Sequence, residues 1–266
     1  MRMSGPIALV GSGEYLPVMR PIDRHLLDGR TPRVVMLPTA AGQEGEERVR
    51  YWNELGLGHY AALGVEATVL PVMTREDAFS TELAALVEGA GLIYLSGGSP
   101  AYLTETLRAT PIAAAIITEW ERGAALGGCS AGACALTAIA GGFRHPEQLG
   151  SKGLGLIDHL AVIPHFDRFD RRSPELVKEI LLKTPDDVTL IGIDERTALV
   201  SIATTIGVPD EFVVMGEQSV WWIDRDGTRH QFEPGAQLSI RKNMTPRVLH
   251  ERSRSIALDE PGSSLP

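Results

Sequence analysis

The chain has 266 residues, of which 44% are hydrophobic and 22% are charged. These values are typical of a globular protein and exclude a disordered or collagen-like chain. The formal net charge of −9 argues against binding to nucleic acid or to an anionic membrane surface. The only cysteines are Cys129 and Cys134, which excludes a disulfide framework and favours a reducing compartment.

The start of the chain runs directly into a short apolar segment at residues 7–10, so we expect no signal peptide. No stretch approaches the roughly 18 uncharged apolar residues that a membrane span requires. The longest apolar candidate, residues 113–120, is interrupted by Glu119. The sequence therefore predicts a cytoplasmic protein that makes no contact with a membrane.

From residue 7 to about residue 200, short runs of Val, Ile and Leu alternate with longer amphipathic segments. Continuous apolar runs of this length suit parallel strands that are covered on both faces. The predicted strands are residues 7–10, 34–37, 68–72, 92–95, 124–127 and 189–193. The predicted helices are residues 17–27, 46–57, 81–88, 102–107, 111–122, 131–139 and 174–183. This alternation predicts an open, mostly parallel α/β sheet with helices on both faces.

After residue 200 the pattern changes to short strands only. They are predicted at residues 212–215, 220–223, 229–232 and 237–240, with a hairpin turn at residues 224–228. We expect these segments to add antiparallel strands to one edge of the sheet. Residues 1–250 contain no linker and are predicted to form a single domain, whereas residues 251–266 are rich in Ser, Pro and charge and predict a flexible tail.

Small and polar residues follow five of the predicted strands. They stand at residues 11–14, 38–42, 96–100, 128–132 and 194–195. One such turn is ordinary loop chemistry, but the carboxyl ends of the strands are where open α/β sheets bind ligands. The whole set therefore predicts a functional site at this edge of the sheet.

The sharpest motif is the G-x-S-x-G at residues 128–132, which follows a predicted strand and precedes an Ala-rich helix. This is the context of a nucleophile elbow, a tight turn that exposes the serine hydroxyl. Ser130 would be the nucleophile, and the N–H of Ala131 would help to hold an oxyanion. Gly98, in the turn after an earlier strand, can supply a second N–H. The alternative is a small-residue turn that only packs a helix on the sheet.

Cys129 is a competing nucleophile, because a thiol is intrinsically the more reactive group. A cysteine elbow centred there would require Gly at position 131, where the chain has Ala131. Cys129 is also expected to end its strand and to point away from the tip of the turn. The sequence therefore favours Ser130, and Cys134, one turn into the helix, is expected in the core.

A serine hydroxyl needs a base, and His165 is the favoured histidine. It follows the apolar run 160–163 and Pro164, and it opens the segment 166–172, which is dense in charge and is expected to be a loop. The other histidines considered are expected at the surface or in structural roles: His25, His59, His145 and His159.

The base in turn needs an acidic partner. The candidates in range of the site are Asp158, Asp167, Asp170, Asp194 and Glu195. Glu195 is favoured because it follows the strand that ends at Ile193, whereas Asp194 could face the opposite way. Three arginines beside the histidine can bind a substrate carboxylate bidentately or form a solvated charged loop: Arg168, Arg171 and Arg172.

Together these motifs resemble the cyanophycinase and peptidase E family of serine peptidases, whose fold is similar to that of class I glutamine amidotransferases. Residues 128–133 resemble the nucleophile motif of that family, and residues 96–98 resemble its oxyanion-side glycine turn. His165-Phe166 resembles the cyanophycinase-type histidine motif, and residues 192–198 resemble the downstream acidic segment. The resemblance spans roughly residues 7 to 200.

The resemblance implies a cytoplasmic serine hydrolase without metal or cofactor, often a homodimer, with Ser130 as nucleophile, His165 as base and Glu195 as third member. The implied substrates are small aspartyl peptides, either β-linked Asp-Arg units or dipeptides with an N-terminal Asp. The peptidase E branch places an Asp shortly after the serine. Residues 140–152 contain no Asp and only Glu147 as an acid, which favours the cyanophycinase-like arrangement.

Two other functions stay open from the residues alone. One is an amidotransferase-like enzyme that uses Cys129. The other is a protein without catalysis, either a binding protein for an acidic or amide metabolite or a scaffold.

Overall fold

The structure is a computed structural model that describes residues 4–141, 150–172, 174–202 and 209–250. Its helices are α1 (Arg20–Leu27), α2 (Glu46–Ala61), α3 (Thr81–Ala85), α4 (Pro100–Leu107), α5 (Pro111–Glu121), α6 (Ala131–Leu136), α7 (Phe166–Arg172) and α8 (Pro174–Lys183). Its strands are β1 (Ile7–Val10), β2 (Arg33–Leu37), β3 (Glu66–Val69), β4 (Leu92–Leu95), β5 (Ala125–Cys129), β6 (Leu160–Pro164), β7 (Thr189–Ile193), β8 (Thr197–Ser201), β9 (Glu211–Gly216), β10 (Val220–Ile223), β11 (Arg229–Phe232), β12 (Gln237–Ser239) and β13 (Arg247–His250).

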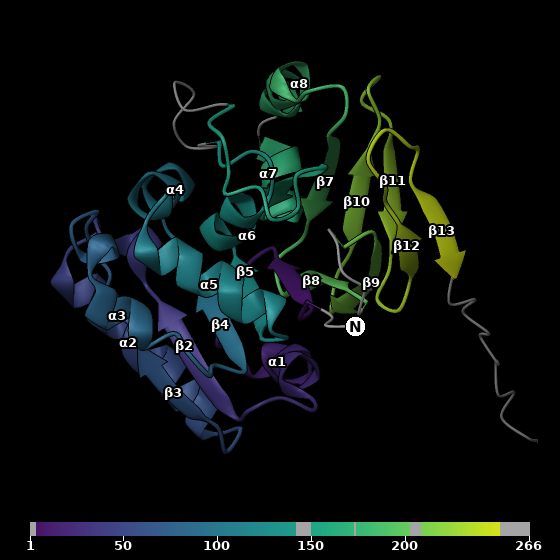
Figure 1. Cartoon of the computed structure of the whole chain (residues 1–266). Helices are drawn as coiled ribbons and strands as arrows, with labels where there is room; N and C mark the ends of the chain where they lie inside the picture. Colours follow the sequence, from purple (N-terminus) through teal and green to yellow (C-terminus); the bar gives the residue numbers. More distant parts are fainter. Residues whose placement is uncertain (1–3, 142–149, 173, 203–208, 251–266) are drawn as a thin grey trace, which may run out of the picture.

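The strands form two sheets (Figure 1). The larger sheet has the order β13-β12-β9-β8-β1-β5-β4-β2-β3. In it, β1, β5, β4, β2 and β3 pair in parallel, while β8, β9, β12 and β13 continue the sheet beyond β1 as antiparallel strands. The smaller sheet has the order β11-β10-β7-β6, in which only β6 and β7 are parallel.

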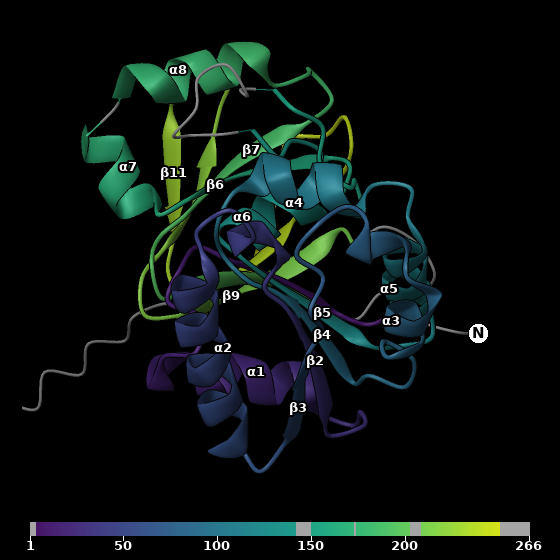
Figure 2. The same cartoon turned by 90° about the vertical axis from the view of Figure 1, so that its left-hand side faces the viewer.

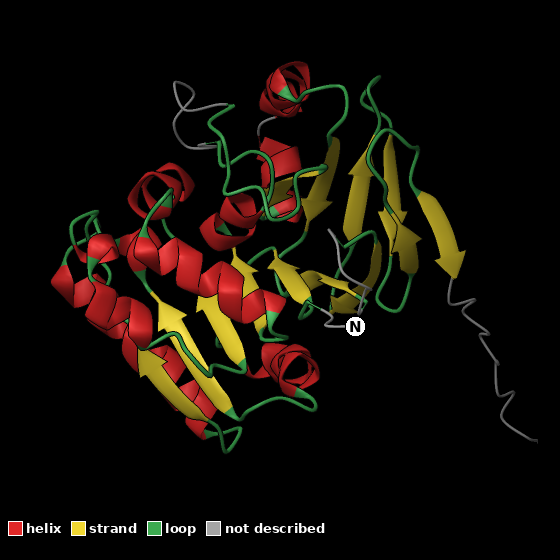
Figure 3. Ribbon diagram, in the orientation of Figure 1, coloured by secondary structure: helices red, strands yellow, loops and turns green. Residues whose placement is uncertain are grey.

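Helices cover both faces of the parallel strands (Figure 3). Residues of β1 show the two faces, because successive side chains point to opposite sides. Ala8 and Val10 pack in one core cluster with α1 and with Tyr60 of α2. Ile7 and Leu9 pack in the other cluster with residues of α4, α5 and α6. Every residue of β1, β4 and β5 is buried, which explains why these strands are continuous apolar or small-residue runs.

The predicted mostly parallel α/β sheet with helices on both faces is confirmed, as are the antiparallel strands near the C-terminus. The expectation that all of the late strands extend one edge is wrong in detail, because β10 pairs with β7 and β11 pairs with β10 in the second sheet. The apolar pattern of residues 189–193 is compatible with a place in either sheet. It therefore could not show which strands pair with this segment. The strands β8 and β13 were not predicted at all.

Residues 166–172 form helix α7 rather than the expected loop. Phe166 is buried, and Phe169, one helical turn later, packs against the same core cluster. This three-residue spacing places both rings on the same face of a helix. The charged residues between them, Asp167 and Arg168, lie on the other faces of that helix. In Figure 2, α7 and α8 lie together beside the second sheet.

The remaining differences concern the ends of elements and the ends of the chain. Strand β3 ends at Val69 and α6 ends at Leu136, each three residues earlier than predicted. Residues 251–266, expected to be a tail, lie outside the described residues. Within the described part of the chain, no helix combines the length and the apolar character that a membrane crossing needs.

Candidate active site

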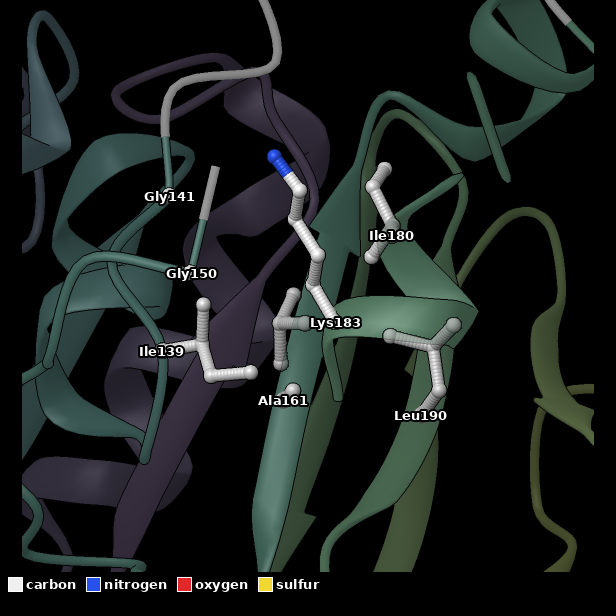
Figure 4. Close-up of a pocket in the computed structure, with 8 residues that line it drawn as sticks. Ile139, Gly141, Gly150, Ala161, Ile180, Lys183 and Leu190 are labelled. Atoms are coloured by element: carbon white, nitrogen blue, oxygen red, sulfur yellow. The ribbon is translucent and has the colours of Figure 1, made fainter. Parts of the chain in front are cut away.

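A cleft of about 1020 Å³ opens where several strands end. Residues of the loops after β1, β4, β5 and β7 line it, together with His165 and residues of α2 and α7. A second pocket, of about 10 Å³, lies between α8 and strands β6 and β7 and is lined mainly by apolar side chains. In Figure 4 the Lys183 ammonium group points away from the apolar side chains of that pocket. The chemistry of the predicted site therefore belongs to the large cleft.

Ser130 stands at the turn between β5 and α6 with φ 51° and ψ −103°. This backbone conformation is uncommon for a residue with a side chain and is the strained geometry of a nucleophile elbow. The Ser130 N–H donates to the carbonyl of Val10 at 2.9 Å, which fixes the turn to β1. A Cβ atom on Gly132 would lie 2.2 Å from the carbonyl oxygen of Leu95. Only glycine permits α6 to approach β4 this closely.

His165 follows β6 directly and also has a positive φ, of 52°. Its Nε2 lies 3.0 Å from the Ser130 hydroxyl oxygen, and its Nδ1 lies 2.9 Å from Oε1 of Glu195. Both distances are within hydrogen-bond range and fit a nucleophile, a base and an acid that orients the base. The structure thus brings together the three residues that the sequence favoured, from three separate strand ends.

Glu195 is held on several sides. Its Oε2 forms an ion pair of 2.7 Å with Nη2 of Arg168. Its N–H donates to Oδ1 of Asp167 at 3.0 Å, and its carbonyl accepts from Nε2 of Gln218 at 2.8 Å. These contacts fix both the main chain and the carboxylate, so that the imidazole of His165 has a fixed partner.

Two of the other acidic candidates, Asp194 and Asp158, have partners other than His165. Asp194 faces away from His165 and accepts hydrogen bonds from the Ser219 N–H at 3.1 Å and from Trp221 Nε1 at 3.0 Å. Burial raises the pKa of Asp194. Asp158 pairs with Lys242 at 2.8 Å. The side chain of Asp170 lies outside the described residues.

Two residues that line the cleft, Gly98 and Ala131, have backbone N–H groups with no acceptor among the described residues. The N–H of Ala131 is in the first turn of α6, where a helix leaves its donors unpaired. Gly98 has φ 141°, a conformation that favours glycine. The neighbouring Gly97 N–H is not free, because it donates to Oε1 of Glu14 at 3.1 Å.

Cys129 does not present a nucleophile to the cleft. Its side chain is fully buried on the face covered by α1 and α2, and its thiol donates to Oε2 of Glu14 at 2.8 Å. Burial and the nearby carboxylate of Glu14 raise the pKa of Cys129 well above its usual range. Since the thiolate is the reactive form, this environment argues against the Cys129-dependent alternative. Cys134 is buried as expected.

The arginines beside His165 differ from the expectation in part. Arg168 lines the cleft, but its guanidinium forms an ion pair with Glu195. It is therefore not a free binding group for a substrate carboxylate. The side chains of Arg171 and Arg172 lie outside the described residues.

Of the histidines, His59 was wrongly expected at the surface. It is buried, and its Nε2 lies 2.7 Å from Oδ2 of Asp23. Helix α2 extends to Ala61, four residues beyond its predicted end, and this last turn faces α1. His159 is also buried, whereas His25 is exposed as expected. His145 lies outside the described residues.

Sequence reasoning missed one wall of the cleft, and it included Glu14 in a predicted strand-end turn without giving it a role. Helix α2 contributes one wall, where Arg48 stacks over the ring of Trp52 at 4.8 Å from its centroid. Glu14 lies at the cleft floor beside Gly97 and Ser130. The position of Glu14 after β1 was the available signal, but nothing in the sequence showed which loops would meet. The described residues contain no group of three or more His, Cys, Asp or Glu side chains placed to hold a metal ion.

The sequence model of Peptidase family S51 matches residues 7–208 of the chain. The chain is also 29% identical over 213 residues to the cyanophycinases of Trichormus variabilis and of a Nostoc species. These alignments cover 76% of this chain but 66% of each relative. The chain therefore matches just under two thirds of the length of these curated proteins.

Solved structures show similar folds. The crystal structure of a peptidase from an acI-B1 actinobacterium matches with a TM-score of 0.81 and 40% sequence identity, over 90% of this chain and 98% of that chain. A peptidase E candidate from Listeria monocytogenes matches with a TM-score of 0.58 and 19% identity, over 80% of this chain and 98% of that chain. At 19% identity, the match to the Listeria monocytogenes structure shows a similar fold and nothing about function.

Proposed function

Since the chain belongs to peptidase family S51, a family of serine-type peptidases, we propose that it hydrolyses aspartyl peptides with Ser130 as its nucleophile. The observation that carries this proposal is the hydrogen-bonded series Ser130–His165–Glu195, with contacts of 3.0 and 2.9 Å. Hydrogen bonds in this order provide a base for the hydroxyl and an acid that orients the base.

The mechanism follows from these contacts. His165 Nε2 takes the hydroxyl proton while the Ser130 oxygen attacks the carbonyl carbon of the scissile amide. Glu195 accepts the Nδ1–H of His165, keeps the imidazole in the tautomer that the reaction needs and stabilises the imidazolium that forms. His165 then donates its proton to the leaving amine, which breaks the C–N bond and leaves an acyl-enzyme on Ser130.

Water completes the reaction. His165 takes one proton from the water as its oxygen attacks the ester carbon, and then returns that proton to Ser130 as the acid product leaves. In both halves of the reaction a tetrahedral intermediate carries a negative oxygen. The N–H groups of Gly98 and Ala131, which have no acceptor among the described residues, would donate to this oxygen.

The substrate part of the proposal rests on the relatives. The curated relatives are named cyanophycinases, and the motifs of this chain resemble the cyanophycinase arrangement with Glu195 as third member. We therefore favour β-linked aspartyl peptides, such as β-Asp-Arg, over dipeptides with an ordinary N-terminal Asp bond. We also propose that the protein is a cytoplasmic homodimer, and light scattering on the purified protein would test the dimer.

The experiment is hydrolysis of a panel of β-Asp-Arg, β-Asp-Lys and α-Asp-X dipeptides, with Ser130→Ala protein as the background control. We expect turnover of the β-aspartyl members. Turnover of α-Asp-X members only would contradict the substrate assignment. Binding of the peptides without any turnover would favour the non-catalytic alternative.

A further inference from the structure

Glu14 is a carboxylate next to the nucleophile that the proposed mechanism does not use. It stands in the loop after β1 and is only 8% exposed. Its Oε1 accepts the N–H of Gly97 at 3.1 Å, and its Oε2 accepts the thiol of Cys129 at 2.8 Å. Both oxygens thus act as acceptors, which suits the ionised form.

The carboxylate of Glu14 faces the same part of the cleft as Ser130. The position that a Cβ atom on Gly97 would take lies 2.9 Å from Oε1 of Glu14 and 3.7 Å from Cβ of Ser130. The carboxylate and the nucleophile therefore flank one glycine. Glu14 and Ser130 both line the large cleft, so a substrate that reaches the hydroxyl also comes close to the carboxylate.

Glu14 has no cationic partner among the described residues. The other two cleft carboxylates each have one, since Glu195 pairs with Arg168 at 2.7 Å and Glu44 lies 3.8 Å from Arg48. Taking a carboxylate out of water is costly unless a charge of opposite sign or sufficient hydrogen bonds offset the loss. One thiol and one amide donor leave room for a further, positively charged donor on the cleft side.

We propose that Glu14 binds the ammonium group of the substrate residue whose carbonyl is attacked by Ser130. The inference rests on the proposed function, because it takes Ser130 as the nucleophile. In an amino-terminal aspartyl residue the amino group lies only a few bonds from the carbonyl carbon that Ser130 attacks, in both the α- and the β-linkage. A carboxylate beside the nucleophile, such as that of Glu14, is therefore well placed to bind this amino group. Glu14 is then a specificity residue that selects peptides with a free amino group.

The alternative role for Glu14 is structural, as a tie between the Gly97 turn and β5. The two roles predict different behaviour. Loss of a structural tie lowers activity on every substrate equally, whereas loss of an ammonium site lowers binding only of peptides that carry a free amino group. The comparison of a peptide with its N-acetylated form separates these roles, because acetylation removes the positive charge and leaves the scissile bond unchanged.

The test measures binding by calorimetry, so that it does not depend on turnover. The ligands are β-Asp-Arg and N-acetyl-β-Asp-Arg, and the proteins are Ser130→Ala, Ser130→Ala/Glu14→Gln and Ser130→Ala/Glu44→Gln. Glutamine keeps the shape of the Glu14 side chain and can still accept from Gly97. The Glu44 variant removes another acidic group of the same cleft and serves as the matched control, and the melting temperature of each protein checks its fold.

We expect Ser130→Ala protein to bind the free peptide at least about tenfold more tightly than the acetylated one, since a hydrogen bond to a charged group is stronger than one between neutral groups. Glu14→Gln should abolish this preference, and Glu44→Gln should keep it. Equal binding of both peptides, binding of neither, or an unchanged preference in a folded Glu14→Gln protein would each overturn the proposal. Turnover by Ser130→Ala protein would instead overturn the proposed function.

Discussion

At the scale of single residues, Glu195 acts through His165 in the proposed mechanism. The Glu195→Gln variant keeps a similar size but places an amide at the Nδ1 of His165 and so disturbs the tautomer that proton transfer needs. We expect kcat to fall by roughly 10²–10⁴-fold, with little change in melting temperature. The measurement is steady-state kinetics on the best peptide of the panel.

The matched control for Glu195→Gln is Asp158→Asn. Asp158 was a sequence candidate for the same role, but it pairs with Lys242 at 2.8 Å rather than with His165. The control should retain wild-type turnover. If both variants had the same kcat as the wild type, Glu195 would not be the third member of the catalytic group.

A second prediction at the residue scale concerns the reactivity of the Cys129 thiol toward alkylation. Burial and the carboxylate of Glu14 raise the pKa of this thiol well above its usual range, so the thiolate that would react is scarcely formed at pH 8. Iodoacetamide at pH 8 should therefore leave both the activity and the mass of the folded protein unchanged. Alkylation of Cys129 that occurs together with loss of activity would favour the cysteine alternative.

At the scale of elements, the approach of α6 to β4 positions the nucleophile. A Cβ atom at position 132 would lie 2.2 Å from the Leu95 carbonyl oxygen, so Gly132→Ala forces the helix away from the strand. We expect the free energy of unfolding to fall by about 3 kcal/mol or more, at the upper end of the usual cost of overpacking. Denaturant unfolding measures the change.

Gly58→Ala is the matched control for Gly132→Ala. Gly58 is an exposed glycine inside α2, and a Cβ atom added there would meet no atom within 4 Å. Alanine there should stabilise the protein by about 0.5–1 kcal/mol, because glycine costs a helix more conformational entropy. Equal destabilisation by both substitutions would argue against close contact as the cause at position 132.

His159, which precedes β6, predicts a pH dependence of stability. Burial lowers its pKa below the ordinary value of 6.5, so between that lowered pKa and pH 6.5 the unfolded state binds more protons than the folded state. Stability should then fall as the pH decreases below about 6.5 and level off below the pKa of folded His159. The melting temperature measured between pH 8 and pH 5 should show this decline.

The control compares His159→Gln with His25→Gln, because His25 is exposed on α1. The His159 variant should flatten part of the decline, and the His25 variant should not. A change of 1 kcal/mol in the free energy of unfolding shifts the melting temperature by about 2–4 °C for a protein of this size. The expected difference between the variants is therefore measurable. An equal slope in all three proteins would contradict the assignment to His159.

At the scale of the whole molecule, the candidate site joins two sheets. Ser130 follows β5 of the large sheet, while His165 and Glu195 follow β6 and β7 of the small one. The nucleophile and its base therefore meet only if the two sheets keep their relative position. Strand β8 contributes to this, since it follows β7 after three residues and pairs with β1 of the large sheet.

The sequence predicted features that arise from neighbouring residues. The buried parallel strands, the turn around Ser130 and the position of His165 after an apolar run are all local patterns, and each was found in place. Apart from the group Ser130–His165–Glu195, the features that depend on distant pairing were not predicted. The partner strands of β7, the contact of His59 with Asp23 and the pairing of Arg168 with Glu195 join segments far apart in the chain, and no local periodicity encodes such pairings.

The charge pattern of segment 166–172 illustrates the same limit. Its density of Asp and Arg suggested a loop, but the burial of Phe166 against Gly192 holds the segment as helix α7. One consequence is that Arg168 contacts Glu195 instead of standing free as a carboxylate receptor. Arg168 thus lines the cleft, but the fold pairs it with a carboxylate of the protein itself.

The role of Ser130 as nucleophile is tested by the kcat/KM of Ser130→Ala relative to the wild type on the best β-aspartyl dipeptide. If Ser130 is the nucleophile, kcat/KM should fall by at least about 10⁴-fold, as expected for removal of a catalytic nucleophile, with an unchanged melting temperature. A folded Ser130→Ala protein that keeps more than about a tenth of wild-type kcat/KM, a loss of less than about 1.4 kcal/mol in transition-state stabilisation, would contradict this role.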